Sequence, residues 1–164
     1  MTLADLPLAV QLHLWPALVA LVLGPVALYR RRRDIWHKAA GYAWVGAMAL
    51  VAVSAFWIEA GVFPIALGFG PIHALSLLVL FGLWRGVSAA RAGDVASHSG
   101  WMRGLYWQAL IVAGSLTLLP GRTLNGLLFP ERPSAGLVVI AAVAAAAVLF
   151  WGMRRIRRRD LAAG

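Results

Sequence analysis

Five long apolar runs, separated by short polar segments, account for most of this chain. The runs cover about residues 8–29, 37–58, 71–87, 101–119 and 135–152. A helix needs about 20 mainly apolar residues to cross the hydrocarbon core of a bilayer, and each run approaches that length. We therefore predict an all-α integral membrane protein with five transmembrane helices.

Composition agrees with this prediction and limits the domain organisation. The chain has 164 residues, of which 62% are hydrophobic and 13% charged, whereas soluble proteins are about 45–50% apolar. Five crossings with short loops leave no room for a soluble catalytic domain. We expect one membrane domain over residues 1–164, in which a four-helix core over 1–120 is followed by an outer loop over 121–134 and by a fifth, peripheral helix with a basic tail over 135–164.

Charge decides the expected orientation. Thirteen of the fifteen Lys and Arg residues lie in alternate loops and in the C-terminal tail, on one side of the predicted protein. By the positive-inside rule this side is cytoplasmic, so the N-terminus is expected outside and the C-terminus inside. The thirteen residues are Arg30, Arg31, Arg32, Arg33, Lys38, Arg85, Arg91, Arg103, Arg154, Arg155, Arg157, Arg158 and Arg159. Their places at helix ends indicate lipid contact, and no nucleic-acid partner is predicted, although the net charge is +9.

The chain contains no cysteine. Disulfides, thiolate metal sites, iron–sulfur clusters and the covalent attachment of c-type haem are therefore excluded. A metal ion or a haem would have to be held by histidine, methionine or carboxylate. The P-loop, the H-E-x-x-H zinc motif and the G-x-S-x-G nucleophile motif are also missing.

Four histidines lie near the ends of the first four predicted helices and repeat with similar spacing. His13 and His37 are 24 residues apart, and His73 and His98 are 25 apart. Helices one–two and three–four thus look like two copies of one hairpin in the same orientation. In an up-down four-helix bundle, helices one and three are diagonal, as are two and four. We expect His13 and His73 to share the outer level and His37 and His98 the inner level.

A diagonal pair of imidazoles can supply both axial ligands of a haem iron, because the porphyrin supplies the other four nitrogens. The pattern predicts b-type haem, one or two per chain, and a role in membrane electron transfer. Small residues on the His13 face, Ala17, Ala20 and Gly24, are expected to leave flat space for a porphyrin. The alternatives are a copper, zinc or iron ion or a proton relay on the same histidines, or an assembly factor for a respiratory complex. Whether the protein is an enzyme, such as a transmembrane oxidoreductase, stays open.

Basic residues near the histidines are candidate cofactor ligands as well. Arg122 follows the fourth helix outside, while Lys38 and Arg103 flank the inner histidines. Arginine suits bidentate binding of a carboxylate such as a haem propionate. The inner residues are also placed to bind a quinol or another small reductant. Besides the lipid bilayer, a second copy of the chain or a respiratory protein is a candidate partner.

Several motifs carry a resemblance to a known family over about residues 10–125. These are His13, the Gly-Pro at 24–25, H-K-x-x-G at 37–41, His73, R-x-G-D at 91–94, H-x-x-W-M-x-R at 98–103 and P-G-R at 120–122. They resemble a bacterial family of small predicted membrane proteins known as a domain of unknown function. This resemblance implies the bacterial inner membrane. More distantly, the histidine layout is similar to that of two-haem transmembrane b-type cytochromes, which implies one haem per leaflet.

Overall fold

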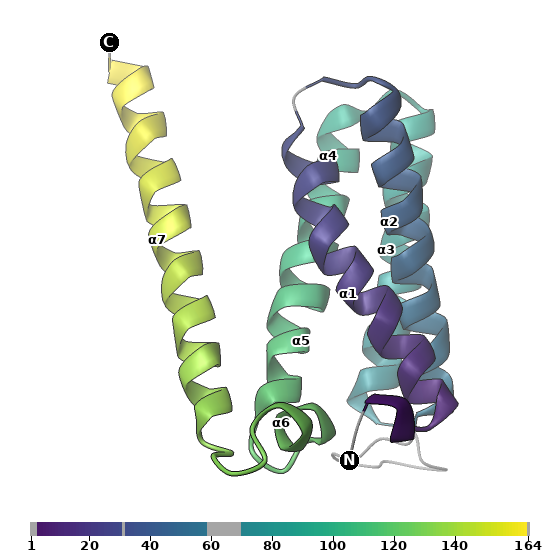
Figure 1. The fold of residues 1–164 in the computed structure, drawn as a ribbon. Coiled ribbons are helices and arrows are strands. Elements are labelled where there is room, and N and C mark those ends of the chain that lie inside the picture. Colours follow the sequence, from purple (N-terminus) through teal and green to yellow (C-terminus); the bar gives the residue numbers. More distant parts are fainter. Residues whose placement is uncertain (1–2, 31, 59–69, 164) are drawn as a thin grey trace. The chain divides into compact units, whose positions relative to one another are not determined.

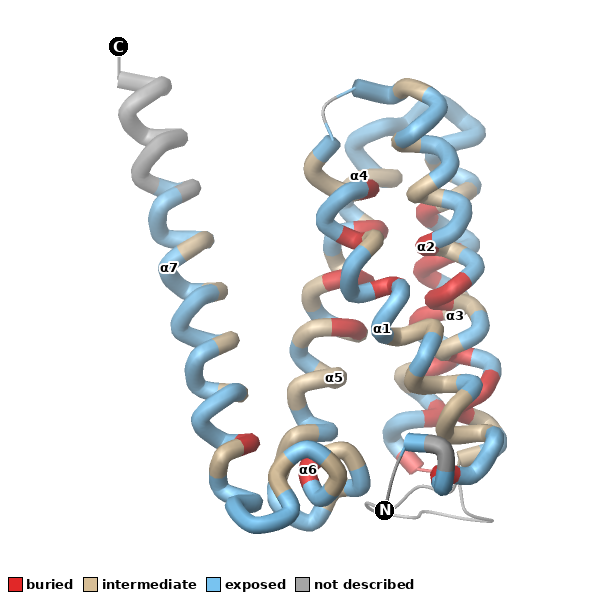
Figure 2. The backbone as a smooth tube through the Cα atoms, viewed as in Figure 1, coloured by how far each residue is buried: buried red, intermediate tan, exposed pale blue. Residues whose placement is uncertain are grey.

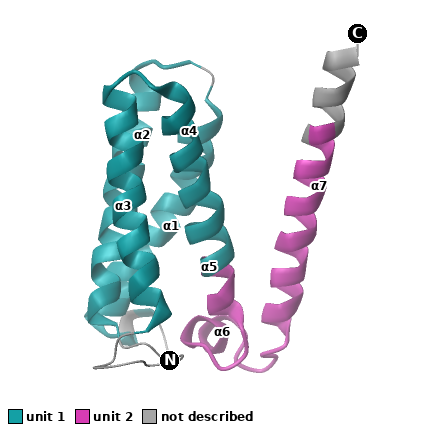
Figure 3. Ribbon diagram, turned by 180° about the vertical axis from the view of Figure 1, so that it is seen from behind, with its two compact units in different colours: residues 1–113 teal, residues 114–164 magenta. Residues whose placement is uncertain are grey.

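The computed structural model describes residues 3–30, 32–58 and 70–163 (Figure 1), and every regular element in these ranges is helical. The all-α prediction is therefore confirmed. The chain divides into two compact units, Met1–Ala113 and Gly114–Gly164 (Figure 3). The predicted boundaries, with a four-helix core over 1–120, stay a prediction.

The first unit is built from helices that meet end to end through short turns. Its elements are η1 (Leu3–Asp5), α1 (Leu8–Tyr29), α2 (Ile35–Ser54), η2 (Ala55–Trp57), α3 (Pro71–Arg91), α4 (Val95–Gly104) and the π-helical segment η3 (Leu105–Val112). Helical structure continues through α5 (Ala113–Ser115) and η4 (Leu116–Leu118) into the second unit.

Within the described residues, four helices are long and apolar enough to cross a membrane. They span Leu8–Tyr29, Ile35–Trp57, Pro71–Arg91 and Ala135–Met153. The predicted crossing at 101–119 lies in a helical stretch that changes from α to π geometry, returns to α over Ala113–Ser115 and ends as 3-10, so no single long α-helix forms there. Apolar helices of this length place the protein in a lipid bilayer, while the count of five crossings stays a prediction.

The four helical segments of the first unit form an up-down bundle, as expected. α1 packs against α2 and against η3, α2 packs against α3, and α3 packs against α4. α1 and α3 are therefore diagonal, and α2 is diagonal to the α4–η3 segment. We call the end where α1 ends and α2 begins the basic end; it also contains the α3–α4 turn (Figure 1).

Aspartate caps begin both helices that start at the basic end. The carboxylate of Asp34 accepts from the backbone N–H of His37 at 3.1 Å, and that of Asp94 accepts from Ser97 at 3.0 Å. Side-chain oxygens at this position satisfy N–H groups that have no partner in the first helical turn. Gly93, with φ of 77°, makes the tight α3–α4 turn in the left-handed region that favours glycine. These caps fix where His37 and His98 enter the bundle.

Large side chains fill the centre of the bundle, between its two ends. Trp44 and Met48 of α2 are each 1% exposed, and Tyr106 of η3 is 6% exposed. The Tyr106 hydroxyl donates to the carbonyl of Leu21, which ties η3 to α1. Buried positions lie on the inward sides of the helices, while much of the outer surface is exposed and apolar (Figure 2). That surface is the one that lipid would cover.

The second unit contains η4, α6 (Thr123–Leu128) and the long helix α7 (Ala135–Ala163). α6 lies in the segment that we expected to be an outer loop. Asn125, 1% exposed, organises this segment because its amide donates to the carbonyls of Leu118 at 2.6 Å and Pro133 at 2.9 Å. A buried amide that bridges two carbonyls carries no signal in a hydropathy profile.

Candidate functional site

The four histidines lie at two levels of the first unit. His37, in the first turn of α2, and His98, in the first turn of α4, are at the basic end. His13, in the second turn of α1, and His73, in the first turn of α3, are at the opposite end. Each pair comes from diagonal helices, as the spacing predicted.

A cavity of about 190 Å³ unites the two histidines of the basic end. His37, Gly41 and Trp44 line it from α2, at intervals that place them on one helix face. His98 and Met102 line it from α4. The bundle therefore brings both histidines of this level to one cavity.

The ring of His98 is held in one orientation. Its Nδ1 lies 2.8 Å from the backbone carbonyl of Gly86 on α3. A carbonyl oxygen can only accept, so Nδ1 carries the proton and Nε2 of the neutral ring keeps its lone pair. Histidines that ligate metals usually donate their other ring N–H in this way, which fixes the tautomer.

Two buried nitrogens near this cavity have no hydrogen-bond partner among the described residues. They are Nδ1 of His37 and Nε1 of Trp44. A buried donor or acceptor without a partner costs about 1–3 kcal/mol, so native proteins rarely leave one unpaired without a reason. Both residues line the cavity, so a molecule bound there is a candidate partner for their nitrogens. The indole nitrogen of Trp44 also lies beside α1, where a Cβ on Gly24 would be 3.2 Å from it.

Three arginines add positive charge to the cavity lining: Arg30, Arg33 and Arg103. Arg30 is already paired, since its Nε donates to Asp34 at 2.8 Å. This ion pair also holds the pKa of the Asp34 carboxyl well below its usual range. Arg33 and Arg103 are exposed residues that line the same cavity. Lys38, a predicted ligand, is exposed and does not belong to the lining.

At the opposite end, His13 is tied to the end of α2. Its Nδ1 lies 3.3 Å from the hydroxyl oxygen of Ser54, and that hydroxyl donates to the carbonyl of Val51 at 3.1 Å. Because the single hydroxyl hydrogen is used on Val51, the His13 ring is the donor to Ser54.

His73 is 5% exposed and acts as part of a helix cap. Its Nδ1 accepts from the backbone N–H of Gly70 at 3.1 Å, and its ring lies 5.7 Å from that of Phe56, between centroids. An Nδ1 that accepts leaves the proton of the neutral ring on Nε2. The Nε2 of His73 is thus not prepared to bind a metal, and the local structure already explains why a histidine stands here.

The two levels fit a haem iron unequally. At the basic end, His98 offers an Nε2 that keeps its lone pair, His37 offers an unpaired Nδ1, and arginines offer partners for carboxylates. At the opposite end, the tautomer of His73 is the wrong one for ligation through Nε2. The flat space expected beside Gly24 is also filled, since a Cβ there would meet the ring of Tyr106 and lie 3.2 Å from Nε1 of Trp44.

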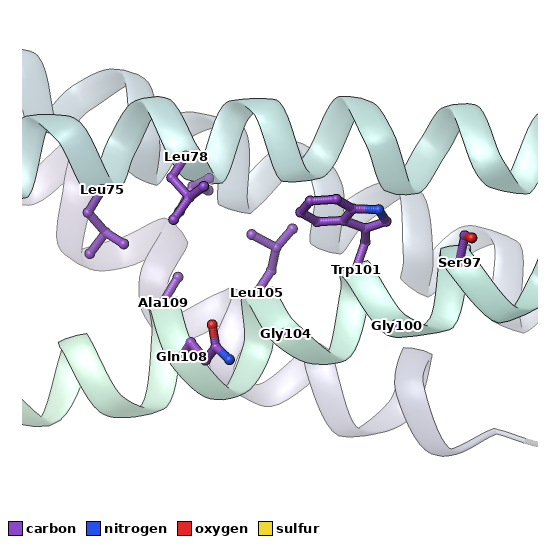
Figure 4. A pocket seen from close by; sticks show the side chains of 10 residues that line it. Leu75, Leu78, Ser97, Gly100, Trp101, Gly104, Leu105, Gln108 and Ala109 are labelled. Carbon is purple, nitrogen blue, oxygen red and sulfur yellow. The ribbon is translucent and has the colours of Figure 1, made fainter.

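A larger apolar groove of about 440 Å³ lies between α3 and the α4–η3 segment (Figure 4). Leu75 and Leu78 line it from α3, and Trp101, Leu105 and Gln108 line it from the other side. Its lining contains no histidine and no charged residue, so it lacks the chemistry that the basic-end cavity has.

The structure does not test two further predictions, a bound metal ion and the role of Arg122 as a cofactor ligand. No group of three or more His, Cys, Asp or Glu side chains able to hold a metal ion occurs in the described part of the chain. Arg122 precedes α6 in the second unit. Its predicted place beside the outer histidines stays a prediction.

An all-helical bundle with apolar outer faces defines an integral membrane protein of unknown activity. Residues 10–125, more than two thirds of the chain, match the model of the family described as "Predicted membrane protein (DUF2306)", and the chain belongs to that family. The resemblance stated from the sequence motifs is thereby confirmed. Neither the curated proteins nor the solved structures include a match to the chain.

Sequence reasoning missed several residues of the cavity lining. Trp44 is seven residues after His37 and Met102 four after His98, so both follow from helical periodicity once the histidines are chosen. Arg30 and Arg33 were assigned only to membrane orientation. Nothing in the sequence distinguishes an arginine that anchors a loop in lipid from one that lines a cavity.

Proposed function

We propose that this protein is a membrane electron carrier that binds one b-type haem at the basic end of the bundle. His37 and His98 would hold the haem iron. The observation that carries the proposal is the hydrogen bond from His98 to the carbonyl of Gly86, which leaves Nε2 prepared for ligation, in a cavity shared with His37. Bound haem would supply reversible one-electron chemistry.

The chain's own residues have distinct roles in this proposal. Gly86 orients the His98 ring through its carbonyl, and the Asp34 cap places the first turn of α2, from which His37 projects. Arg33 and Arg103 would bind the carboxylates of the cofactor, for which arginine is well suited. The packed centre around Trp44 separates this site from the opposite end and limits access of water from that side.

Cavity size sets a requirement on this function. A volume of about 190 Å³ is below the roughly 300 Å³ at which sites for drug-sized molecules begin. Haem would therefore enter only if lining side chains move outward. The flexible ones are Met102 and the arginines at the basic end, because these side chains have several rotatable bonds.

A metal ion without porphyrin, the alternative on the same histidines, has less support here. Arg33 and Arg103 line the cavity and form no ion pair within the described residues, and positive side chains raise the energy of a bound cation. Haem carries carboxylates of its own, which offset that charge. Among the described residues, no third ligand of the histidine, cysteine or carboxylate type joins His37 and His98.

Visible spectroscopy of the purified protein tests the proposal. The chain is produced in a haem-replete host, and reduced-minus-oxidised spectra and haem content are measured. We expect the sharp bands of low-spin haem at one equivalent per chain. His37→Ala and His98→Ala should lose the haem, whereas His13→Ala and His73→Ala should retain it. A colourless protein, or loss of haem only in the His13 and His73 variants, would contradict the proposal.

We also propose that the N-terminus lies outside and the C-terminus inside the bacterial inner membrane. The support is the concentration of basic residues at the basic end of the first unit and in the C-terminal tail. This orientation would let a cytoplasmic or membrane-borne donor, such as a quinol or another small reductant, reach the site. Fusions of a periplasm-active and a cytoplasm-active reporter to each terminus test it; an active periplasmic reporter at the C-terminus would refute it.

A further inference from the structure

We infer that the basic-end cavity contains a binding subsite for an oxyanion, a carboxylate or phosphate group, formed by Arg33, Arg103 and the buried indole N–H of Trp44. This inference goes beyond the proposed function, because it needs no haem. A haem propionate would be one occupant, and the phosphate of a lipid or of a soluble compound would be another.

Charge is the first support. Among the arginines that line the cavity, Arg30 is neutralised by Asp34, whereas no ion pair is formed by Arg33 or Arg103 within the described residues. The acidic cap residues Asp34 and Asp94 do not belong to the lining. An anion in the cavity would therefore meet positive charge, with no carboxylate among the lining residues that the structure describes.

Two unpaired buried nitrogens are the second support, and they are independent of the arginines. Trp44 is 1% exposed, and its N–H has no acceptor in the described part of the chain. An indole N–H can only donate, so it needs an acceptor such as an oxyanion. Nδ1 of His37 is similarly buried and becomes a second donor when the ring carries its proton there.

Size and position agree with this ligand class. About 190 Å³ is several times the roughly 30 Å³ that one water occupies, so an oxyanion group fits where a whole porphyrin needs more room. The helices α2 and α4 both begin at this end, and helix N-termini favour negative charge. At the inner headgroup level, lipid phosphates are the anions at highest local concentration.

Native mass spectrometry of the full chain in detergent tests the inference. The chain is titrated with phosphatidylglycerol, with phosphatidylcholine and with inorganic phosphate. Arg33→Leu/Arg103→Leu removes two lining charges, and Arg32→Leu/Lys38→Leu is the control, since it removes two exposed charges nearby that do not line the cavity. We expect the lining variant to bind the anionic probe about tenfold more weakly than the control variant.

The probes distinguish the source of the anion. Binding of phosphatidylglycerol that inorganic phosphate does not displace indicates a lipid headgroup, and displacement by phosphate indicates a soluble ligand. Equal weakening in the two double variants, equal binding of phosphatidylcholine, or no saturable binding would overturn the inference. Haem content is recorded for each sample, so that a colourless protein with a saturable anion site refutes the proposed function and not this one.

Trp44→Phe supplies a second test, because it removes the N–H and keeps an aromatic ring. We expect weaker anion binding, while the thermal midpoint without ligand stays the same or rises, since a buried unpaired donor is gone. A variant that unfolds more readily but binds the anion like the wild type would assign Trp44 to packing alone and remove it from the subsite.

Discussion

The imidazole of His98 donates to the backbone carbonyl of Gly86 at 2.8 Å, so a ring at the start of α4 is locked against α3. His73 has the reverse arrangement, in which Nδ1 accepts from the backbone of Gly70 at 3.1 Å. Two histidines that look equivalent in the sequence are therefore fixed as opposite tautomers. Of these two histidines, only His98 has the tautomer that leaves Nε2 able to bind a metal.

This difference predicts a result for nuclear magnetic resonance. With ¹⁵N-labelled histidine in cofactor-free protein at alkaline pH, the proton of His98 should be on Nδ1 and that of His73 on Nε2. Single His→Asn variants assign the signals. Finding both rings in the same tautomer would show that these hydrogen bonds do not hold the rings as described.

Gly24 brings α1 close to the ring of Tyr106 in the bundle centre. In Gly24→Ala, the new Cβ would press on the ring of Tyr106, which cannot move far because its hydroxyl is bonded to the Leu21 carbonyl. We expect a loss of about 1–3 kcal/mol in the free energy of unfolding, as for other overpacked cores. Gly46→Ala is the control, because a Cβ there meets nothing within 4 Å. Unfolding in mixed micelles measures the free energy of unfolding of both variants. Equal values would contradict the packing described.

The two aspartate caps predict how stability depends on pH. The Arg30 hydrogen bond lowers the pKa of Asp34, and hydrogen bonds from Ser97 lower the pKa of Asp94. The unfolded chain, with ordinary aspartate pKa values of 3.8, binds these protons first as pH falls. The stability that these carboxylates contribute is therefore complete above about pH 4 and is lost as pH falls below it.

Asp34→Asn/Asp94→Asn tests this dependence, because asparagine keeps a cap acceptor but does not titrate. We expect the thermal midpoint of the double variant to fall less steeply between pH 4 and pH 2 than that of the wild type. Glu131→Gln, which removes an exposed carboxylate that caps no helix, should leave the slope unchanged. If the thermal midpoint fell equally steeply with pH in all three proteins, the two aspartate caps would not be the cause of the pH dependence.

Asn125 predicts a local effect in the second unit. Asn125→Leu keeps similar bulk but leaves the carbonyls of Leu118 and Pro133 without the amide that they accept from. We expect the free energy of local opening to fall by about 1–3 kcal/mol. This change would be measured as faster amide hydrogen exchange over residues 118–133. Thr123→Ala, at an exposed position that starts α6, should exchange like the wild type. Unchanged exchange in Asn125→Leu would show that the two hydrogen bonds do not hold this segment together.

Hydropathy and spacing were sufficient for the fold class and for the levels of the histidines. The length of an apolar run identifies a membrane-spanning helix because the thickness of the bilayer sets that length. The predicted run at 8–29 coincides with α1. The repeat of 24 and 25 residues placed His13 with His73 and His37 with His98, since the helices alternate in direction. The start of α4 at Val95 was missed, because its first turn is polar and only the cap at Asp94 indicates it.

By itself, the sequence determined an all-helical membrane protein with its histidines paired at two levels, because periodicity and hydropathy act locally along the chain. Only the tertiary structure decided which pair lines a common cavity and how the rings are held. That choice depends on hydrogen bonds between residues distant in sequence, such as His98 with Gly86, and on which side chains fill the space between helices. Trp44 and Tyr106 close the centre, while Arg33 and Arg103 reach a cavity that no linear pattern reveals.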